Sequence, residues 1–282
     1  MSGIDSVRKK LAALARRIGL VQARPISQYP ELLEAIERLT SPRQQFHALP
    51  SLAKATVLRL QDNGRTNWLI FEGGKRRMTT KLMFFPTSQN NIIIFGERSD
   101  LPREIRFEGS GNIAICGNDI QWAQVTMRFI SDDAVICLGH GSIYNGTAII
   151  VEGNGCGVEI GRECLFAPGT TIRSSDLHGM YDIASGAWLN APAPVYLEPH
   201  CWLGQDVLVL KGAHVGGGSV IAARSVVNSA LPRFSIIAGT PARAVRDGIC
   251  WSLARQPDPA EIDKVRDLLQ RTIEIDGTKS SF

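Results

Sequence analysis

The sequence has no uninterrupted apolar run of the roughly 20 residues that a membrane-spanning helix needs. Its first residues, MSGIDSVRKKLAALARRIGL, hold apolar positions, but Arg16 and Arg17 cut them short of the apolar core of a secretory signal. Charged residues make up 21% of the 282, and the formal net charge is only +4. So mild a charge argues against a nucleic-acid partner and suits a polyanionic small molecule. We therefore expect a cytoplasmic protein.

Cysteine pairs with metal-binding spacing are also missing. The six cysteines stand alone at Cys116, Cys137, Cys156, Cys164, Cys201 and Cys250. None forms the CxxC pairs of zinc sites, and no secretory signal supports a disulfide framework. We expect no bound metal and no structural disulfides.

A six-residue repeat dominates the C-terminal half. It reads IGRECL, FAPGTT and IRSSDL over 160–177, then LEPHCW, LGQDVL, VLKGAH, VGGGSV and IAARSV over 197–226. The first position is always apolar, at Ile160, Phe166, Ile172, Leu197, Leu203, Val209, Val215 and Ile221. The fifth is small or β-branched, at Cys164, Thr170, Cys201, Val207, Ala213, Ser219 and Ser225, and only Asp176 departs from this rule. Cys164 and Cys201 are thus expected to fill space in a core.

A period of six predicts a β-helix. Three short strands and three corners make a coil of about 18 residues, and successive coils stack like the strands of a sheet. Apolar first positions point inward, and corners favour small residues because the backbone bends there. Shorter β-rich stretches, such as IRFEG and AIIVEG, recur less evenly before residue 158.

The expected fold is therefore mainly β, in three parts. Residues 1–90 form an N-terminal helical and short-strand region, with helices before about residue 20 and over 30–39. Residues 91–240 form the β-helix domain, and residues 241–282 hold a C-terminal segment whose stretch DPAEIDKVRDLLQRTI predicts a helix.

A long insertion interrupts the repeat. From Ile172 to Leu197 the chain uses 25 positions where one unit would use 6, so 19 residues leave the coil. A smooth stack of coils has few clefts of its own. The inserted loop, residues 178–196, is therefore expected to form the wall of a binding site.

Three segments carry a family resemblance: IGRECLFAPGTTIRSSDLHGMYD, HCWLGQDVLVLKGAHVGGGSVIAARSVV and SIIAGTPARAVR. They resemble the hexapeptide-repeat (left-handed β-helix) acyltransferases, and most closely the O-acetyltransferases of capsular polysaccharide and O-antigen. The resemblance implies a left-handed coil, a homotrimer, acetyl-CoA as acyl donor and a glycan or sugar-nucleotide acceptor. Leu177 and the Ala223-Arg224 pair depart from the usual residues of the family at those positions.

The resemblance places the catalytic histidine at His178, where the repeat breaks into the loop. Acetyl transfer to a hydroxyl needs a base, and histidine has a suitable pKa of about 6.5. Asp176 has three candidate roles: it orients His178, binds an acceptor hydroxyl, or forms a turn that leaves the coil.

For the acceptor, the repeat phase turns Trp202 outward, one position before the inward Leu203. The resemblance places Trp202 in the acetyl or acceptor pocket. Within the loop, Tyr181, Trp188 and Asn190 are candidate sugar contacts, because aromatic faces and amides suit a carbohydrate.

For acetyl-CoA, the resemblance implies a site between coils of two subunits. Backbone groups at Gly204, Ala222 and Ala223 would contact the pantetheine arm, because small corner residues let a ligand approach closely. Lys211, Arg224 and Arg243 are the candidate phosphate ligands.

Alternatives remain open. The enzyme could acetylate the amine of an amino sugar nucleotide, or the β-helix could be a non-catalytic scaffold. A carbonic anhydrase with the same fold would need three histidine ligands in a spacing that His140, His178, His200 and His214 do not reproduce. The basic N-terminal helix either caps the end of the β-helix or makes peripheral contact with a membrane.

Overall fold

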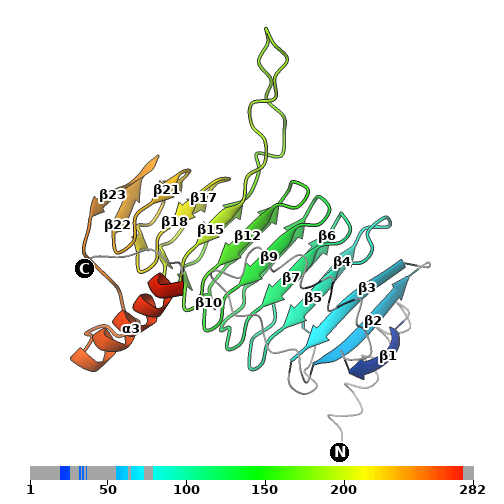
Figure 1. The fold of residues 1–282 in the computed structure, drawn as a ribbon, viewed down its shortest axis with the longest axis horizontal. Coiled ribbons are helices and arrows are strands. Elements are labelled where there is room, and N and C mark those ends of the chain that lie inside the picture. Colours follow the sequence, from blue (N-terminus) through cyan, green and yellow to red (C-terminus); the bar gives the residue numbers. More distant parts are fainter. Residues whose placement is uncertain are drawn as a thin grey trace, which may run out of the picture.

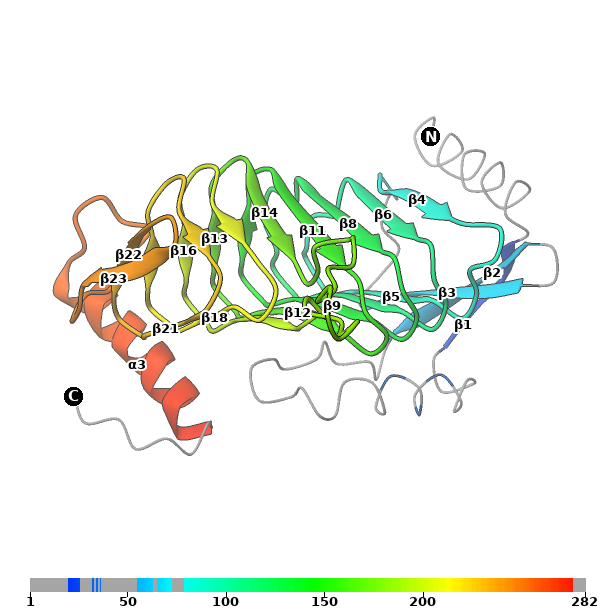
Figure 2. The same cartoon turned by 90° about the horizontal axis from the view of Figure 1, so that it is seen from above.

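A computed structural model describes residues 20–25, 32, 34, 36, 55–62, 65–72 and 79–275. In this part of the chain the backbone winds into an elongated parallel β-solenoid, with one long arm rising from its side (Figures 1 and 2). Helix α3 (Pro259–Ile275) lies at the C-terminal end of the solenoid (Figure 1). The predicted mainly β fold with a C-terminal helix is confirmed.

Three sheets form the faces of the solenoid. The ten-stranded sheet consists, in spatial order, of β1 (Leu20–Pro25), β2 (Thr56–Asp62), β3 (Arg65–Phe71), β5 (Ile92–Phe95), β7 (Ile113–Cys116), β9 (Val135–Leu138), β12 (Gly157–Ile160), β15 (Val195–Leu197), β18 (His214–Val215) and β21 (Ala230–Leu231). The seven-stranded sheet consists of β4 (Lys81–Phe84), β6 (Glu104–Phe107), β8 (Val125–Phe129), β11 (Thr147–Val151), β14 (Thr170–Arg173), β17 (Leu208–Val209) and β20 (Val226–Val227). The six-stranded sheet consists of β10 (Ile143–Tyr144), β13 (Leu165–Phe166), β16 (Trp202–Leu203), β19 (Val220–Ile221), β22 (Ile236–Gly239) and β23 (Ala242–Arg246).

The strand register confirms the predicted repeat. Leu203 pairs with Ile221 and Val209 with Val227, so a coil here takes 18 residues. Ile160 pairs with Leu197, a step of 37 residues that equals one coil of 18 plus the 19 inserted residues. Earlier coils are longer, since Ile136 pairs with Val158, a step of 22 residues. The six-residue pattern fades before residue 158 for this reason.

The inward positions form the predicted core. All eight first positions named above, and all seven fifth positions, are at most 1% exposed. Rings in neighbouring coils stack, with centroids 4.7 Å apart for Phe107 and Phe129 and 4.6 Å apart for Tyr144 and Phe166. Cys164 and Cys201 are buried free thiols, as expected for residues that fill space.

Buried asparagines join the first coils in a ladder. Asn67 Oδ1 accepts hydrogen bonds from the backbone N–H and the side-chain amide of Asn91, both at 3.0 Å. Asn91 Oδ1 accepts the same two bonds from Asn112, and Asn112 Oδ1 accepts one from the N–H of Ala134. Each amide thereby satisfies a donor of the next coil that burial would leave unpaired.

The corners differ from our expectation that small residues occupy them. At the corner between the ten-stranded and six-stranded sheets, successive coils place a residue at φ of 50–71°, at Arg98, Asp119, Gly141, Glu163, His200, Gly218 and Phe234. Large residues are tolerated because the backbone hydrogen bonds to the next coil offset the modest cost of this conformation.

The N-terminal region is described only in part. The predicted first helix lies outside the described residues, and of 30–39 only residues 32, 34 and 36 are described, with helical backbone. Residues 20–25, expected within the helical region, instead form β1, which runs antiparallel to β2. The predicted boundary at residues 90 and 91 stays a prediction. The ten-stranded sheet is continuous across it, since β3 pairs with β5.

A column of glycines sets how closely coils approach. Gly96, Gly117, Gly139, Gly161 and Gly216 each follow an inward residue, and a Cβ on any of them would lie closer than 3.0 Å to backbone of the next coil. In the coil after Gly161 the same position is taken by Glu198.

We predict that Gly161→Ala lowers the free energy of unfolding by about 3 kcal/mol, because backbone at Glu198 and Pro199 would have to move. Gly186→Ala is the matched control. Gly186 sits at φ 71° with nothing within 4 Å of an added Cβ, so the cost should stay near 1 kcal/mol. Chemical denaturation of both variants checks this, and equal losses would contradict the close approach of the coils.

Candidate active site

Residues 174–194 leave the solenoid between β14 and β15 and return as a hairpin arm (Figure 1). The inserted loop was predicted at 178–196, but it begins earlier, and residues 195 and 196 belong to β15. Tyr181 and Trp188 face each other across it in an antiparallel bridge. A cavity of about 720 Å³ lies where the arm meets the coils. The arm side of its wall includes Asp176, His178, Tyr181, Trp188 and Asn190, and the coil side includes Ser131 and residues 152–156. The loop thus forms the wall of a pocket.

Asn190 holds the base of the arm together. Its side-chain amide donates to Asp176 Oδ2 at 2.9 Å and to the main-chain oxygen of His178 at 2.8 Å. Its Oδ1 accepts from the N–H of Met180 at 2.7 Å and from Nε1 of Trp188 at 3.0 Å. Asn190 is buried and lines the pocket wall, and its role as a sugar contact stays a prediction.

Asp176 is paired with Lys211. The Lys211 ammonium donates to Asp176 Oδ2 at 2.6 Å and to the main-chain oxygen of Asn190 at 2.8 Å. Hydrogen bonds from Lys211 and then Asn190 lower the pKa of Asp176 below its ordinary value, against a smaller opposing effect of burial. Asp176 is therefore an anion at neutral pH.

His178 is exposed at the pocket wall. Within the described part of the chain its imidazole makes no hydrogen bond, and Asp176 is bonded to Lys211 and Asn190. The ring is thus available to an incoming ligand, while its backbone is held through Asn190. The roles of His178 as base and of Asp176 as its orienting partner stay predictions.

Trp202 points outward as the repeat phase predicts, at 38% exposed beside a fully buried Leu203. It does not line the pocket of His178. It belongs to β16 in the six-stranded sheet, where its ring lies 5.9 Å from that of Trp251. Trp251 stacks on His200 at 4.3 Å, and its Nε1 donates to the main-chain oxygen of His200. His200 therefore anchors the C-terminal segment.

The cofactor candidates divide between two corners. Gly204 and residues 222–224 lie where the chain passes from the six-stranded to the seven-stranded sheet, here called the donor corner. Arg224 is there at φ 60°, its exposed guanidinium 3.8 Å from Asp206, and the exposed Arg243 is on β23. Lys211 lies at a different corner, with Asp176. Lys211 is thus separated from the other phosphate candidates within one chain.

Sequence reasoning missed Glu152 and Ser175, which line the pocket and bond to each other through the Ser175 hydroxyl. The signal was present in the related stretches FEG at 107–109 and VEG at 151–153. Register confirms the relation, because Phe107 pairs with Phe129 and Phe129 with Val151.

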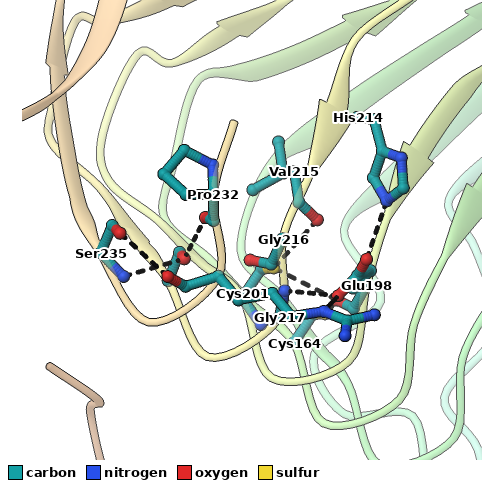
Figure 3. Close-up of polar contacts among 11 residues, drawn as sticks. Cys164, Glu198, Cys201, His214, Val215, Gly216, Gly217, Pro232 and Ser235 are labelled. Atoms are coloured by element: carbon teal, nitrogen blue, oxygen red, sulfur yellow. Dashed lines mark hydrogen bonds and ion pairs between the residues drawn. The ribbon is translucent and has the colours of Figure 1, made fainter. Parts of the chain in front are cut away.

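A second polar cluster surrounds Glu198 at the corner between the ten-stranded and six-stranded sheets (Figure 3). His214 Nε2 bonds to Glu198 Oε1 at 2.9 Å, and the N–H of Gly217 donates to Oε2 at 2.8 Å. Arg233 Nε donates to the same Oε2. Burial would raise the pKa of Glu198, but the hydrogen bonds from His214, Arg233 and Gly217 outweigh it and lower this pKa from 4.5 to about 2. Glu198 uses its charge to join coils.

This pairing predicts acid sensitivity. Because the folded-state pKa of Glu198 is depressed, its stabilisation is complete above about pH 4.5 and is lost as the pH falls toward 2. Glu198→Gln should lower the free energy of unfolding by about 3 kcal/mol at pH 7 and by less at pH 3. Denaturation curves at both pH values test this, and a gap that does not change with pH would refute it.

Within the described residues, no group of three or more His, Cys, Asp or Glu side chains could hold a metal ion. Among the same residues, no helix is long and apolar enough to cross a membrane.

The fold and its repeat define the class of the protein as a β-solenoid of the kind seen in hexapeptide-repeat acetyltransferases. The crystal structure of the polysialic acid O-acetyltransferase OatWY superposes with a TM-score of 0.57 at 22% identity, covering 68% of this chain and 96% of that one. The polysialic-acid-specific acetyltransferase NeuO gives 0.53 at 24% identity, covering 67% and 99%. At these identities the comparison shows the fold.

Sequence relatives agree, although no family model matches the chain. The polysialic acid O-acetyltransferases of Escherichia coli O1:K1 and Neisseria meningitidis are each 27% identical, over 42% and 44% of this chain. A galactoside O-acetyltransferase of Lactococcus lactis is 32% identical over 42% of it. The matches span 37%, 57% and 59% of these relatives' lengths, so less than two thirds of each is covered. The predicted resemblance to hexapeptide-repeat acetyltransferases is confirmed.

Proposed function

We propose that the protein transfers the acetyl group of acetyl-CoA to a sugar hydroxyl of a capsule, lipopolysaccharide or related glycan precursor. The observation that carries this is an exposed His178 on the wall of a pocket that an inserted arm builds on an acetyltransferase-type solenoid. The relatives are named as O-acetyltransferases of polysialic acid and of galactosides, and these names support a glycan acceptor. We place the enzyme in the cytoplasm.

In this reaction His178 acts as general base. Its imidazole takes the proton of the acceptor hydroxyl as that oxygen attacks the thioester carbonyl, and later returns a proton to the departing thiolate. The ester oxygen comes from the acceptor, and the thiol leaves. Asn190 fixes the backbone of His178, and Lys211 with Asp176 holds the arm in place. Such positioning supplies part of the rate enhancement, because the reacting groups meet already oriented.

The donor corner suits acetyl-CoA, which supplies the activated acetyl group. Gly204, Ala222 and Ala223 keep this edge of the coil thin, so a pantetheine arm can lie along the backbone. The exposed guanidinium groups of Arg224 and Arg243 are available to phosphates. We assign Lys211 to the acceptor side, because it bonds to Asp176.

One chain alone does not bring the donor corner to His178, because the seven-stranded sheet separates the two corners. We propose that the coil is left-handed and that a homotrimer completes the site between neighbouring copies. The arm supports this, because Met180, Ile183 and Leu189 are exposed on it and Ile183 reaches 103%. Apolar side chains gathered on a protruding hairpin are typical of a surface that another chain covers.

Calorimetry tests the donor half of the proposal. We expect saturable binding of acetyl-CoA, weakened about tenfold in Arg243→Ala by loss of a charge-assisted hydrogen bond. Arg246→Ala, exposed on the same strand β23, should bind like the wild type. The absence of binding at millimolar cofactor, or equal effects of the two variants, would contradict the assignment.

A radiolabelled acetyl-transfer assay tests the base. His178→Ala should reduce kcat by about 10²- to 10⁴-fold without changing acetyl-CoA affinity, because only proton removal is lost. Ser185→Ala, in the exposed turn of the same arm, controls for disturbance of the arm and should retain most activity. Normal turnover in His178→Ala would sink the mechanism.

A further inference from the structure

The charges on the pocket wall point to a class of acceptor, an inference that rests on the proposed function. We propose that the sugar unit entering this pocket is uncharged, and that Glu152 selects it by accepting its hydroxyl hydrogens and repelling acidic sugars. Glu152 would be a specificity-determining residue.

The described wall of the cavity carries two carboxylates and neither lysine nor arginine. Asp176 lies on the arm side and Glu152 on the coil side. Asp176 is balanced by Lys211, which already bonds to it and to the main chain of Asn190. Glu152 has no such cation bonded to it in the described part of the chain, since its side-chain partner there is the hydroxyl of Ser175.

The fold contains an internal comparison for Glu152. Glu108 holds the equivalent place two coils earlier, where it accepts bonds from Arg128 at 2.6 and 3.2 Å and pairs with Arg106 at 3.0 Å. In the coil after Glu152 the equivalent arginine is Arg173, but no hydrogen bond or ion pair joins the two. The same scaffold therefore bonds Glu108 to two guanidinium groups and bonds Glu152 to a hydroxyl. Arg128, which is already bonded to Glu108, acts on Glu152 only through its charge at longer range.

This wall matches the chemistry of a neutral sugar. An ionised carboxylate only accepts hydrogen bonds, so it needs donors, and sugar hydroxyls provide them. The rings of Tyr181 and Trp188 offer apolar faces to the C–H surface of a sugar ring. An acidic sugar would bring a carboxylate that gives no hydrogen and faces like charge, which a specific site uses to reject a ligand.

Arg173 is the feature that most favours the opposite reading. It lies outward on β14 opposite Ile150, its Nε is buried without a partner, and its charge contributes to lowering the pKa of Asp176 after the hydrogen bonds named above. It is not part of the pocket wall. If the acceptor were acidic, Arg173 would be the residue to bind its carboxylate.

A matched pair of polymers tests the proposal. Polygalacturonate and its fully methyl-esterified form share the same hydroxyls and differ in charge at every unit. With acetyl-CoA saturating, we expect kcat/KM to be about tenfold higher for the ester, because one like-charge contact in a solvent-exposed pocket lowers it by about this factor. High salt should raise the rate on the acid and leave that on the ester unchanged, because salt screens repulsion.

Variants identify the residue. Glu152→Gln should lower kcat/KM for the ester a few-fold, because an amide is a weaker acceptor, and raise it for the acid, so the preference collapses. Glu108→Gln, from the equivalent place outside the pocket, should keep the wild-type preference, and so should Arg173→Gln.

Three outcomes overturn the inference. The wild type could prefer the acid, and Arg173→Gln could abolish that preference. Arg173 would then be the residue that binds the acceptor. If Glu152→Gln keeps the wild-type preference for the ester, Glu152 does not select the acceptor. Transfer to neither polymer would also reject it, and acetyl-CoA binding by the same preparation would then leave the donor half of the proposed function standing. Failure of both binding and transfer would remove the proposed function itself.

Discussion

Each coil must hydrogen-bond to the next along its strands, and the rest of the molecule depends on this constraint. Backbone groups at 160, 197, 215 and 231 stand in one column, because each coil is the pairing partner of its neighbour. Like side chains then meet like, which explains stacked phenylalanines, asparagine amides that bridge coils, and glycines where two corners approach most closely. The arm obeys the same rule, since it leaves and re-enters the stack without shifting the register.

Two carboxylates show that a charge held between coils can have different roles. Glu198 and Asp176 both have lowered pKa values, and both are held by a cation. Glu198 is buried among His214, Arg233 and Gly217, so its charge is consumed in joining coils. Asp176 sits where the arm departs, half open to the pocket, so its charge fixes the shape of a surface that ligands reach. The position of each carboxylate relative to the coils therefore decides whether its charge stabilises the fold or shapes the pocket.

The sequence revealed most of the solenoid because a short-period repeat is local information. The apolar first positions of the repeat, from Ile160 to Ile221, could be assigned to the core from their spacing. The length of the insertion could also be predicted from the spacing. The earlier coils could not be assigned in this way, because their turns of about 22 residues do not divide into units of six. β1 was missed because residues 20–25 gain their strand from pairing with β2, a contact that propensity does not encode.

At the site, residue types could be predicted but their partners could not. His178, Tyr181 and Trp188 do line one pocket with Asp176 and Asn190. The bond from Lys211 to Asp176 joins residues 35 positions apart, and that between Trp251 and His200 joins residues 51 apart. Such contacts depend on which corner each residue occupies, and corner identity follows only once the coil length is known.

The return of the arm in register has a consequence for how such a protein changes over time. Because coils on either side pair as though the arm were absent, its length and side chains can vary without loss of any strand pairing in the stack. The solenoid then acts as a constant scaffold, and the arm is an insertion that can vary on it. On the proposed function, new acceptors can be explored by altering the arm, while the strand pairing of the solenoid and the donor corner stay unchanged.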